Sequence, residues 1–269
     1  STGIAGVISG TGGLTKAGSG TLSLTGTTSN TYTGLTHVQG GTLAVGGGFA
    51  TNGAIQGNVT IDSGATFDLL QSNIIADGSD FTINGTLDMS GLTEVLGNVQ
   101  GSGAIINHTN DGSGLTLDDL NGTHTYTGNI SGEGALNIRG NIDDSGTQEL
   151  SGGTIALSNL RVGDGALTIK SGATVTATGS TIVATNRTAE IPGIAQAAVS
   201  ATLNIESGSL TTQGIVAGNR NGGFATTGVI NHSGGTVTTT GDASEGNGVR
   251  LWHWPSSNIT YNLSGGTLT

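Results

Sequence analysis

The sequence predicts an all-β solenoid, a fold in which short coils of strand stack on one another. Three observations lead to this prediction: 51 of the 269 residues are glycine, apolar and polar residues alternate in short segments, and one sequence motif recurs. The motif reads as a strand, a glycine turn and a second strand, and its clearest copies are residues 203–210, 230–237 and 261–268. Because one such unit cannot bury its own apolar face, it must stack on further copies.

Composition separates this fold from other glycine-rich classes. Collagen is excluded because there is no strict Gly-X-Y period and the chain holds only 2 prolines. A flexible linker is excluded because small aliphatic residues keep alternating with Thr, Ser and Asn throughout. Hydrophobic residues make up 33% of the chain and aromatic residues 3%, which suits the thin interior of a solenoid.

Charge and cysteine content narrow the classes of partner. The net charge is −11 with seven basic residues, so a nucleic-acid partner is not expected, because phosphate contacts need clustered Lys and Arg. The chain has no cysteine, which excludes disulfides and thiolate metal sites.

No apolar run approaches the roughly 20 residues of a membrane-spanning helix. No signal peptide is visible at Ser1, and the last residues stop within a repeat, so a longer parent protein is expected.

The glycine turns set the coil length over residues 1–180. Neighbouring turns lie roughly 18 to 23 residues apart, the length of three short strands joined by tight turns. The turns fall at Gly41, Gly64, Gly85, Gly103, Gly134, Gly153 and Gly172. Between them, period-2 segments such as 21–25, 59–61, 115–117, 136–138, 167–169 and 174–177 predict strands with one face turned inward.

Beyond residue 180 the coils lengthen. Insertions are expected at about 185–200, 218–228 and 242–257, within one continuous solenoid that spans 1–269. The first two begin alike, with Ile182-Val183-Ala184 matching Ile215-Val216-Ala217, so the loops should leave the stack on the same side. Insertions on one face are where solenoids often carry their binding surfaces.

One stretch has a family likeness. Gly18-Ser19-Gly20-Thr21-Leu22 is followed by Tyr32-Thr33-Gly34 and then by Gly40-Gly41-Thr42-Leu43, with a weaker copy over residues 115–128. In order and spacing, residues 18–45 resemble the passenger-associated repeat of bacterial autotransporters. The resemblance implies rungs of a right-handed parallel β-helix displayed on the cell surface. It implies no activity, because such passengers include adhesins, proteases, esterases and inert stalks.

Catalytic equipment is not evident. Asp118-Asp119 and Asp143-Asp144 are the adjacent acidic pairs, and neighbours on a strand point to opposite faces, so neither suits the paired carboxylates of a glycosidase. The five histidines have no partner at metal-ligand spacing, and no nucleophile elbow is present. We therefore expect a non-enzymatic protein without a cofactor or metal.

Two polar patterns predict stacking. The aligned Asn204, Asn231 and Asn262 are expected to form a buried ladder in which each amide bonds the next. Thr-x-Thr pairs, at residues 31–33, 125–127, 174–178 and 236–240, raise the possibility of ice binding, which requires stacking on one flat face in consecutive coils. Their uneven spacing and the strand preference of threonine favour a purely structural role.

The candidate contact site lies on the third insertion, which holds both tryptophans of the chain. Its residues are Arg250, Trp252, His253 and Trp254, and Arg220 and Arg187 on the preceding insertions could lie alongside. Alternating aromatic side chains can stack on sugar rings or anchor a protein. The other interpretation is that this loop covers the side or end of the solenoid.

These observations favour a secreted or cell-surface structural and adhesive solenoid, a stalk or filament segment. Its expected partners are a host or neighbouring cell surface, a glycan or copies of itself. Two alternatives remain open: a β-helix that binds or cleaves carbohydrate, and a self-assembling subunit of an extracellular filament.

Overall fold

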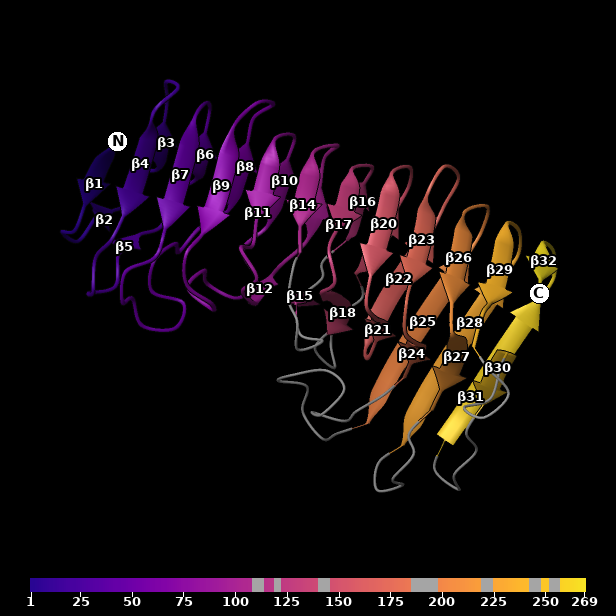
Figure 1. Ribbon diagram of the computed structural model, residues 1–269. Coiled ribbons are helices and arrows are strands. Elements are labelled where there is room, and N and C mark those ends of the chain that lie inside the picture. Colours follow the sequence, from indigo (N-terminus) through magenta and orange to yellow (C-terminus); the bar gives the residue numbers. More distant parts are fainter. Residues whose placement is uncertain are drawn as a thin grey trace.

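The computed structural model describes residues 1–107, 114–118, 122–139, 146–184, 198–218, 225–241, 248–251 and 257–269. Within these ranges the chain forms strands β1 to β32 and no helix, and all strand pairs are parallel. The described part therefore contains no helix that could cross a bilayer. The all-β parallel solenoid predicted from the glycine turns is confirmed, and Figure 1 shows its strands stacked from one end of the molecule to the other.

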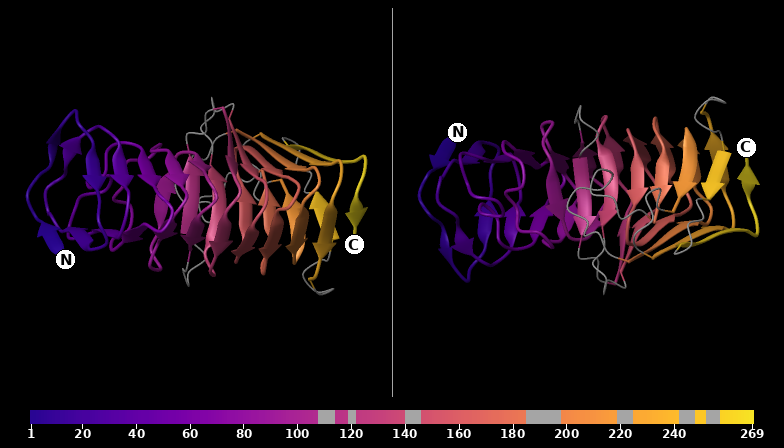
Figure 2. Two further views of the ribbon diagram at one scale, coloured as in Figure 1. Left: turned by 90° about the horizontal axis from the view of Figure 1, so that it is seen from above. Right: turned by 90° about the horizontal axis from the view of Figure 1, so that it is seen from below.

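One twelve-stranded sheet runs the whole length of the rod, with the two termini at opposite ends (Figures 1 and 2). Every coil contributes one strand to it. Its strands, in spatial order, are β1 (Thr2–Ile4), β4 (Thr21–Leu24), β7 (Thr42–Val45), β9 (Thr66–Leu69), β11 (Thr86–Asp88), β14 (Ala104–Ile106), β17 (Asn129–Ser131), β20 (Thr154–Leu157), β23 (Thr174–Ala177), β26 (Ser209–Thr212), β29 (Thr236–Thr239) and β32 (Thr267–Leu268).

The sheets that form the other sides of the solenoid differ between its N-terminal and C-terminal halves. The N-terminal half has a two-stranded sheet of β2 (Ser9–Gly10) and β5 (Thr31–Tyr32), and a five-stranded sheet of β3 (Leu14–Lys16), β6 (Thr36–Val38), β8 (Val59–Ile61), β10 (Phe81–Ile83) and β13 (Val99–Gln100).

In the C-terminal half these sides are replaced by two longer-running sheets. The seven-stranded sheet holds β12 (Glu94–Leu96), β15 (Gly114–Asp118), β18 (Ala135–Arg139), β21 (Leu160–Val162), β24 (Thr181–Val183), β27 (Gly214–Ala217) and β30 (Gly248–Leu251). The six-stranded sheet holds β16 (Thr123–Tyr126), β19 (Thr147–Leu150), β22 (Gly165–Ile169), β25 (Val199–Ile205), β28 (Thr226–His232) and β31 (Ser257–Leu263).

The core consists of columns of aliphatic side chains, one from each coil. In the twelve-stranded sheet the central column is buried and in register, and it comprises Leu43, Phe67, Leu87, Ile105, Ile130, Ile155, Val175, Leu210 and Val237. Phe67 and Phe81 meet edge to face across the interior, with ring centroids 6.0 Å apart. Alternate residues on each strand point outward, which accounts for the period-2 pattern of the sequence.

Glycine turns hold neighbouring coils close together. Gly153 has φ +73°, and a Cβ atom there would lie 2.0 Å from the carbonyl oxygen of Gly128 in the coil before. Only glycine satisfies both the backbone angle and this approach. The turns predicted from the sequence thus mark points where the backbones of successive coils meet.

The insertions join the seven-stranded sheet to the six-stranded sheet. They follow β24, β27 and β30, which are neighbours in one sheet, and they precede β25, β28 and β31, which are neighbours in the other. The boundaries expected from the sequence are too wide, because β25 begins at Val199 and β28 at Thr226, and the whole of β30 lies within 242–257.

Candidate functional site

The outer surface of the seven-stranded and six-stranded sheets, from which the insertions leave, is the candidate site. Of the predicted contact residues, Arg250 is described: it lies on β30, is exposed, and pairs in register with Val216. Trp252, His253, Trp254, Arg220 and Arg187 lie outside the described residues. Beside Arg250, the apolar Leu251 is 42% exposed, so a basic and an apolar side chain stand together where the third insertion begins.

A column of residues leads along the seven-stranded sheet to Arg250, and its polar part is the run of Thr116, Asn137 and Arg161, of which Thr116 and Asn137 are buried. Its members follow one another in register on the outer face: Val95, Thr116, Asn137, Arg161, Ile182, Val216 and Arg250. Asn137 donates from Nδ2 to Thr116 Oγ1 (3.2 Å) and accepts at Oδ1 from Arg161 Nη1 (3.1 Å). Two rungs, those of Ile182 and Val216, separate Arg161 from Arg250, so the two guanidinium groups belong to different parts of the column.

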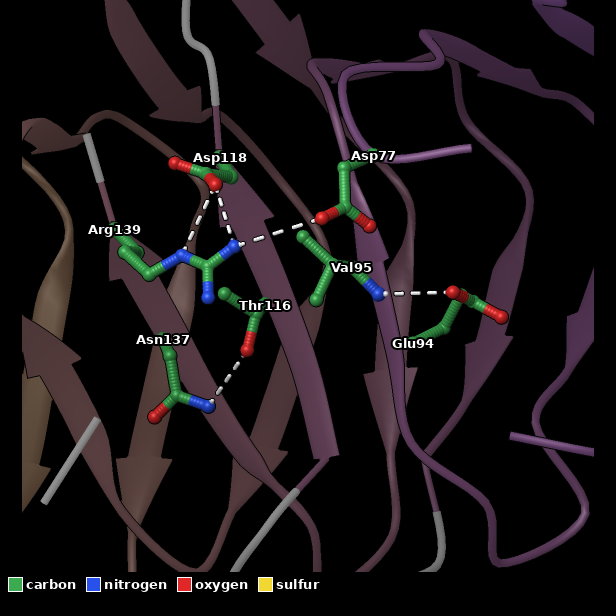
Figure 3. A network of polar contacts seen from close by, with 7 residues as sticks. All are labelled: Asp77, Glu94, Val95, Thr116, Asp118, Asn137 and Arg139. Atoms are coloured by element: carbon green, nitrogen blue, oxygen red, sulfur yellow. Dashed lines mark hydrogen bonds and ion pairs between the residues drawn. The ribbon is translucent and has the colours of Figure 1, made fainter. Parts of the chain in front are cut away.

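Two acidic residues near this column, Asp118 and Asp77, lie beside Arg139 (Figure 3). Asp118 and Arg139 are paired across β15 and β18, and Arg139 donates from Nε (3.0 Å) and Nη2 to Asp118 Oδ2. The same Nη2 lies 4.0 Å from Asp77 Oδ2. Both members of the first pair are mostly buried, with 13% and 14% of their side chains exposed. A carboxylate that accepts two hydrogen bonds from one guanidinium group is engaged in a structural contact.

The structure thus gives Asp118 a partner that the sequence did not suggest. Sheet register places Arg139 opposite Asp118, one coil away, a pairing that their separation along the sequence does not reveal. Asp119, Asp143 and Asp144 lie outside the described residues. Within those that are described, no group of three or more His, Asp or Glu side chains is arranged to hold a metal ion.

Glu94 is a buried acid with a raised pKa on this side of the molecule. It is 1% exposed, and burial raises the pKa of its carboxyl from 4.5 to about 7, although hydrogen bonds from the backbone N–H groups of Ile74, Val95 and Ile75 act in the opposite direction. The donor distances are 3.0, 3.1 and 3.4 Å respectively. A pKa near 7 suits general acid–base chemistry, but both oxygens of this carboxyl are directed at backbone inside the rod.

Glu94 and Gln148 were missed from the sequence, although strand alternation held a signal for both. Each lies two residues from a buried leucine, Leu96 or Leu150, and therefore points inward. Gln148 is fully buried: its Oε1 accepts from Val99 N (3.2 Å), and its Nε2 donates to Val99 O (2.9 Å). These two polar side chains lie where the sheets of the N-terminal half give way to those of the C-terminal half.

The three asparagines are joined in a ladder on the six-stranded sheet. Asn231 donates from Nδ2 to Asn204 Oδ1 (2.9 Å), and Asn262 donates to Asn231 Oδ1 (2.8 Å). At the other end, Asn204 donates to Thr168 Oγ1 (3.1 Å). The ladder is on the outer face, partly exposed, and not buried as expected, because Leu203, Ile205 and Ile230 take the inward positions of the alternation. What it contributes to stability stays a prediction.

Comparison with known proteins identifies one repeat. A family model described as the passenger-associated-transport-repeat matches residues 14–45, and the resemblance predicted for this stretch is confirmed. The match extends from β3 to β7 and includes Tyr32 on β5, whose buried phenol oxygen is 2.7 Å from Thr36 Oγ1. Neither the curated proteins nor the solved structures gave a match.

Proposed function

We propose that this chain is a segment of a secreted, rod-shaped autotransporter-type passenger that works on the bacterial cell surface as a non-enzymatic stalk. The observation that carries the proposal is the twelve-stranded sheet, whose register continues through every coil and through a passenger-type repeat near its start. Eleven inter-strand steps of about 4.8 Å give a rod of roughly 50 Å. Such a rod can hold a lateral surface at a fixed distance from its point of attachment.

The surface location can be tested on intact cells of the source bacterium. Antibodies raised against the purified chain should label unpermeabilised cells, and external protease should remove the label while a cytoplasmic marker stays intact. Labelling that requires permeabilised cells would contradict the proposal. Small-angle scattering of the purified chain supplies the shape: an elongated rod is expected, and a globular distance distribution would exclude a stalk.

The adhesive contact is proposed on the three lateral insertions. Support comes from their described flanks, which lie side by side in two sheets, and from exposed Arg250 and Leu251 at the start of the third. A Trp252→Ala, Trp254→Ala double variant should keep its fold, measured by circular dichroism, and lose binding to cells or to a glycan array. Arg220→Ala serves as a milder companion. If the double variant loses its fold instead, the loop covers the solenoid rather than a partner.

Two other functions are outcomes of the same experiments. Polymers in electron micrographs of the purified chain would indicate a filament subunit. Shortening of an oligosaccharide on incubation with the chain would indicate carbohydrate cleavage and overturn the non-enzymatic assignment.

A further inference from the structure

The C-terminal half of the twelve-stranded sheet carries a two-column array of hydroxyl side chains on its outer face. The columns are in register over five consecutive strands, β20, β23, β26, β29 and β32 (Figure 1). One column is Thr154, Thr174, Ser209, Thr236 and Thr267, and the other is Ala156, Thr176, Thr211, Thr238 and Thr269. We call these ten positions the threonine array.

The array is open to solvent and uncharged. Thr154, Thr174, Thr236, Thr267 and Thr269 are exposed, and the other five side chains are partly exposed. Nine of the ten positions carry a hydroxyl group, and eight of those also carry a methyl group, so the face presents regular polar and apolar points. A β-branched side chain has few χ1 rotamers, which keeps these points fixed without a further loss of entropy on binding.

The same sheet provides a contrast in its N-terminal half. There the first column holds Thr21, Thr42, Thr66 and Thr86, and Ala104 and Asn129 separate these from the array. The second column is Ser23, Ala44, Asp68, Asp88 and Ile106. Asp68 and Asp88 are in register on adjacent strands, and Ser90 Oγ donates to Asp68 Oδ1 (2.8 Å). Two carboxylates and an isoleucine therefore interrupt the pattern, and the paired hydroxyl columns are a property of one end of the rod.

The spacing of the array is that of a two-dimensional lattice. Neighbouring strands lie about 4.8 Å apart, and residues i and i+2 on a strand lie about 6.6 Å apart. The distance between strands is close to the shorter oxygen repeat on the faces of hexagonal ice, and the distance along a strand is somewhat less than the longer repeat. A ligand that matches such a surface must itself be flat and periodic. Sugar rings and protein partners are usually held by aromatic or Arg side chains, and the array has neither.

We infer that the threonine array binds ice, through water molecules ordered by its hydroxyl and methyl groups. This activity goes beyond the proposed stalk: a rod can act as a stalk without binding ice, and the two are measured separately. The uneven sequence spacing of the Thr-x-Thr pairs does not count against the inference, because the insertions join the other two sheets and leave the register of this sheet intact.

Ice binding is tested on the purified chain by nanolitre osmometry and by ice recrystallisation. The wild-type chain is expected to show thermal hysteresis, faceted crystals and inhibited recrystallisation. Thr211→Lys, at the centre of the array, should abolish all three, because a long charged side chain prevents close approach of a flat surface. Thr238→Lys, one strand further along, should do the same.

The matched control is Thr66→Lys, which makes the same change on the same face of the same sheet outside the array. It should retain wild-type activity. Circular dichroism melts must show that all three variants are folded, which is expected because each side chain points outward. The inference is overturned if the folded wild-type chain shows no thermal hysteresis, or if Thr66→Lys and Thr211→Lys behave alike.

Discussion

At the residue scale, two buried polar side chains substitute for backbone where the solenoid changes its cross-section. Ile55 and Ile75 form a backbone bridge between two successive coils. The N–H groups of Ile74 and Ile75 donate to the side-chain carboxylate of Glu94 in the coil that follows. Buried backbone donors need an acceptor. The carboxylate of Glu94 is that acceptor for Ile74 and Ile75. The arrangement places an ionisable group in the core.

This buried ionisable group predicts a pH dependence of stability. The pKa of Glu94 is raised from 4.5 to about 7 by burial, so between these values the folded chain binds more protons than the unfolded chain, and stability falls as pH rises. A shift of this size corresponds to about 3 kcal/mol. Urea unfolding at pH 5 and pH 8 should show the decrease, and Glu94→Gln should flatten it. An equal slope in both proteins would assign the dependence to other groups.

The asparagine ladder predicts a second effect at this scale. Asn231 makes hydrogen bonds to both neighbours, so Asn231→Ala removes two, whereas Asn262→Ala removes the single bond to Asn231. At about 1 kcal/mol or less for each partly exposed bond, the first variant should lower the free energy of unfolding by about 1–2 kcal/mol and the second by about half of that. Thermal melts measure both, and an unchanged Tm for Asn231→Ala would refute a stabilising ladder.

At the scale of the element, Gln148 adds side-chain hydrogen bonds to a seam between two sheets that the backbone also connects, through the parallel bridge of Gly101 and Tyr126. Its amide bonds both polar groups of Val99 on β13, the last strand of the five-stranded sheet, and also donates to His124 O (3.1 Å) on β16, the first strand of the six-stranded sheet. A primary amide carries a donor and an acceptor in the geometry of a peptide group. Gln148 therefore continues the ladder across the seam.

Removing this amide should be costly. Gln148→Leu leaves the N–H and C=O of Val99 without their Gln148 partners in the interior, at about 1–3 kcal/mol for each group. The matched control is Gln100→Leu. Gln100 lies next to Val99 on β13 and is exposed, and the hydrogen bond described for its side chain is to Thr82 Oγ1. Urea titration should show a loss of several kcal/mol for the first variant and about 0.5 kcal/mol or less for the second. Comparable losses would mean that Gln148 does not bridge the sheets.

The elements themselves could largely be predicted from the sequence, because period-2 alternation and glycine turns are local. Partners across coils could not. Arg139 lies opposite Asp118, a residue of the coil before, because register decides which residues lie side by side, and register depends on the length of every turn and insertion. The threonine array shows the same limit: pairs that are unevenly spaced along the chain, such as Thr176 and Thr211, are direct neighbours in the sheet.

At the scale of the whole molecule, each coil pairs with the coils before and after it, so stability should behave as a sum of nearest-neighbour terms. The rod has one continuous twelve-stranded sheet, whereas the five-stranded sheet ends and the seven-stranded and six-stranded sheets begin between residues 94 and 126. Glu94 and Gln148 lie at that transition, which makes it the place where the two halves are coupled by side chains as well as by backbone.

A substitution that disrupts one coil should therefore affect only the coils beside it. Gly235 has φ +74°, and a Cβ atom there would lie 2.0 Å from Gly208 O, so Gly235→Ala must separate two coils near the C-terminal end. Hydrogen exchange should rise in β26, β29 and β32 and stay at the wild-type rate in β4, β7 and β9. Gly64→Ala is the control, since Gly64 has a similar φ of +78° but open space around its Cβ position. Faster exchange throughout the rod in Gly235→Ala would show that the solenoid unfolds as one cooperative unit.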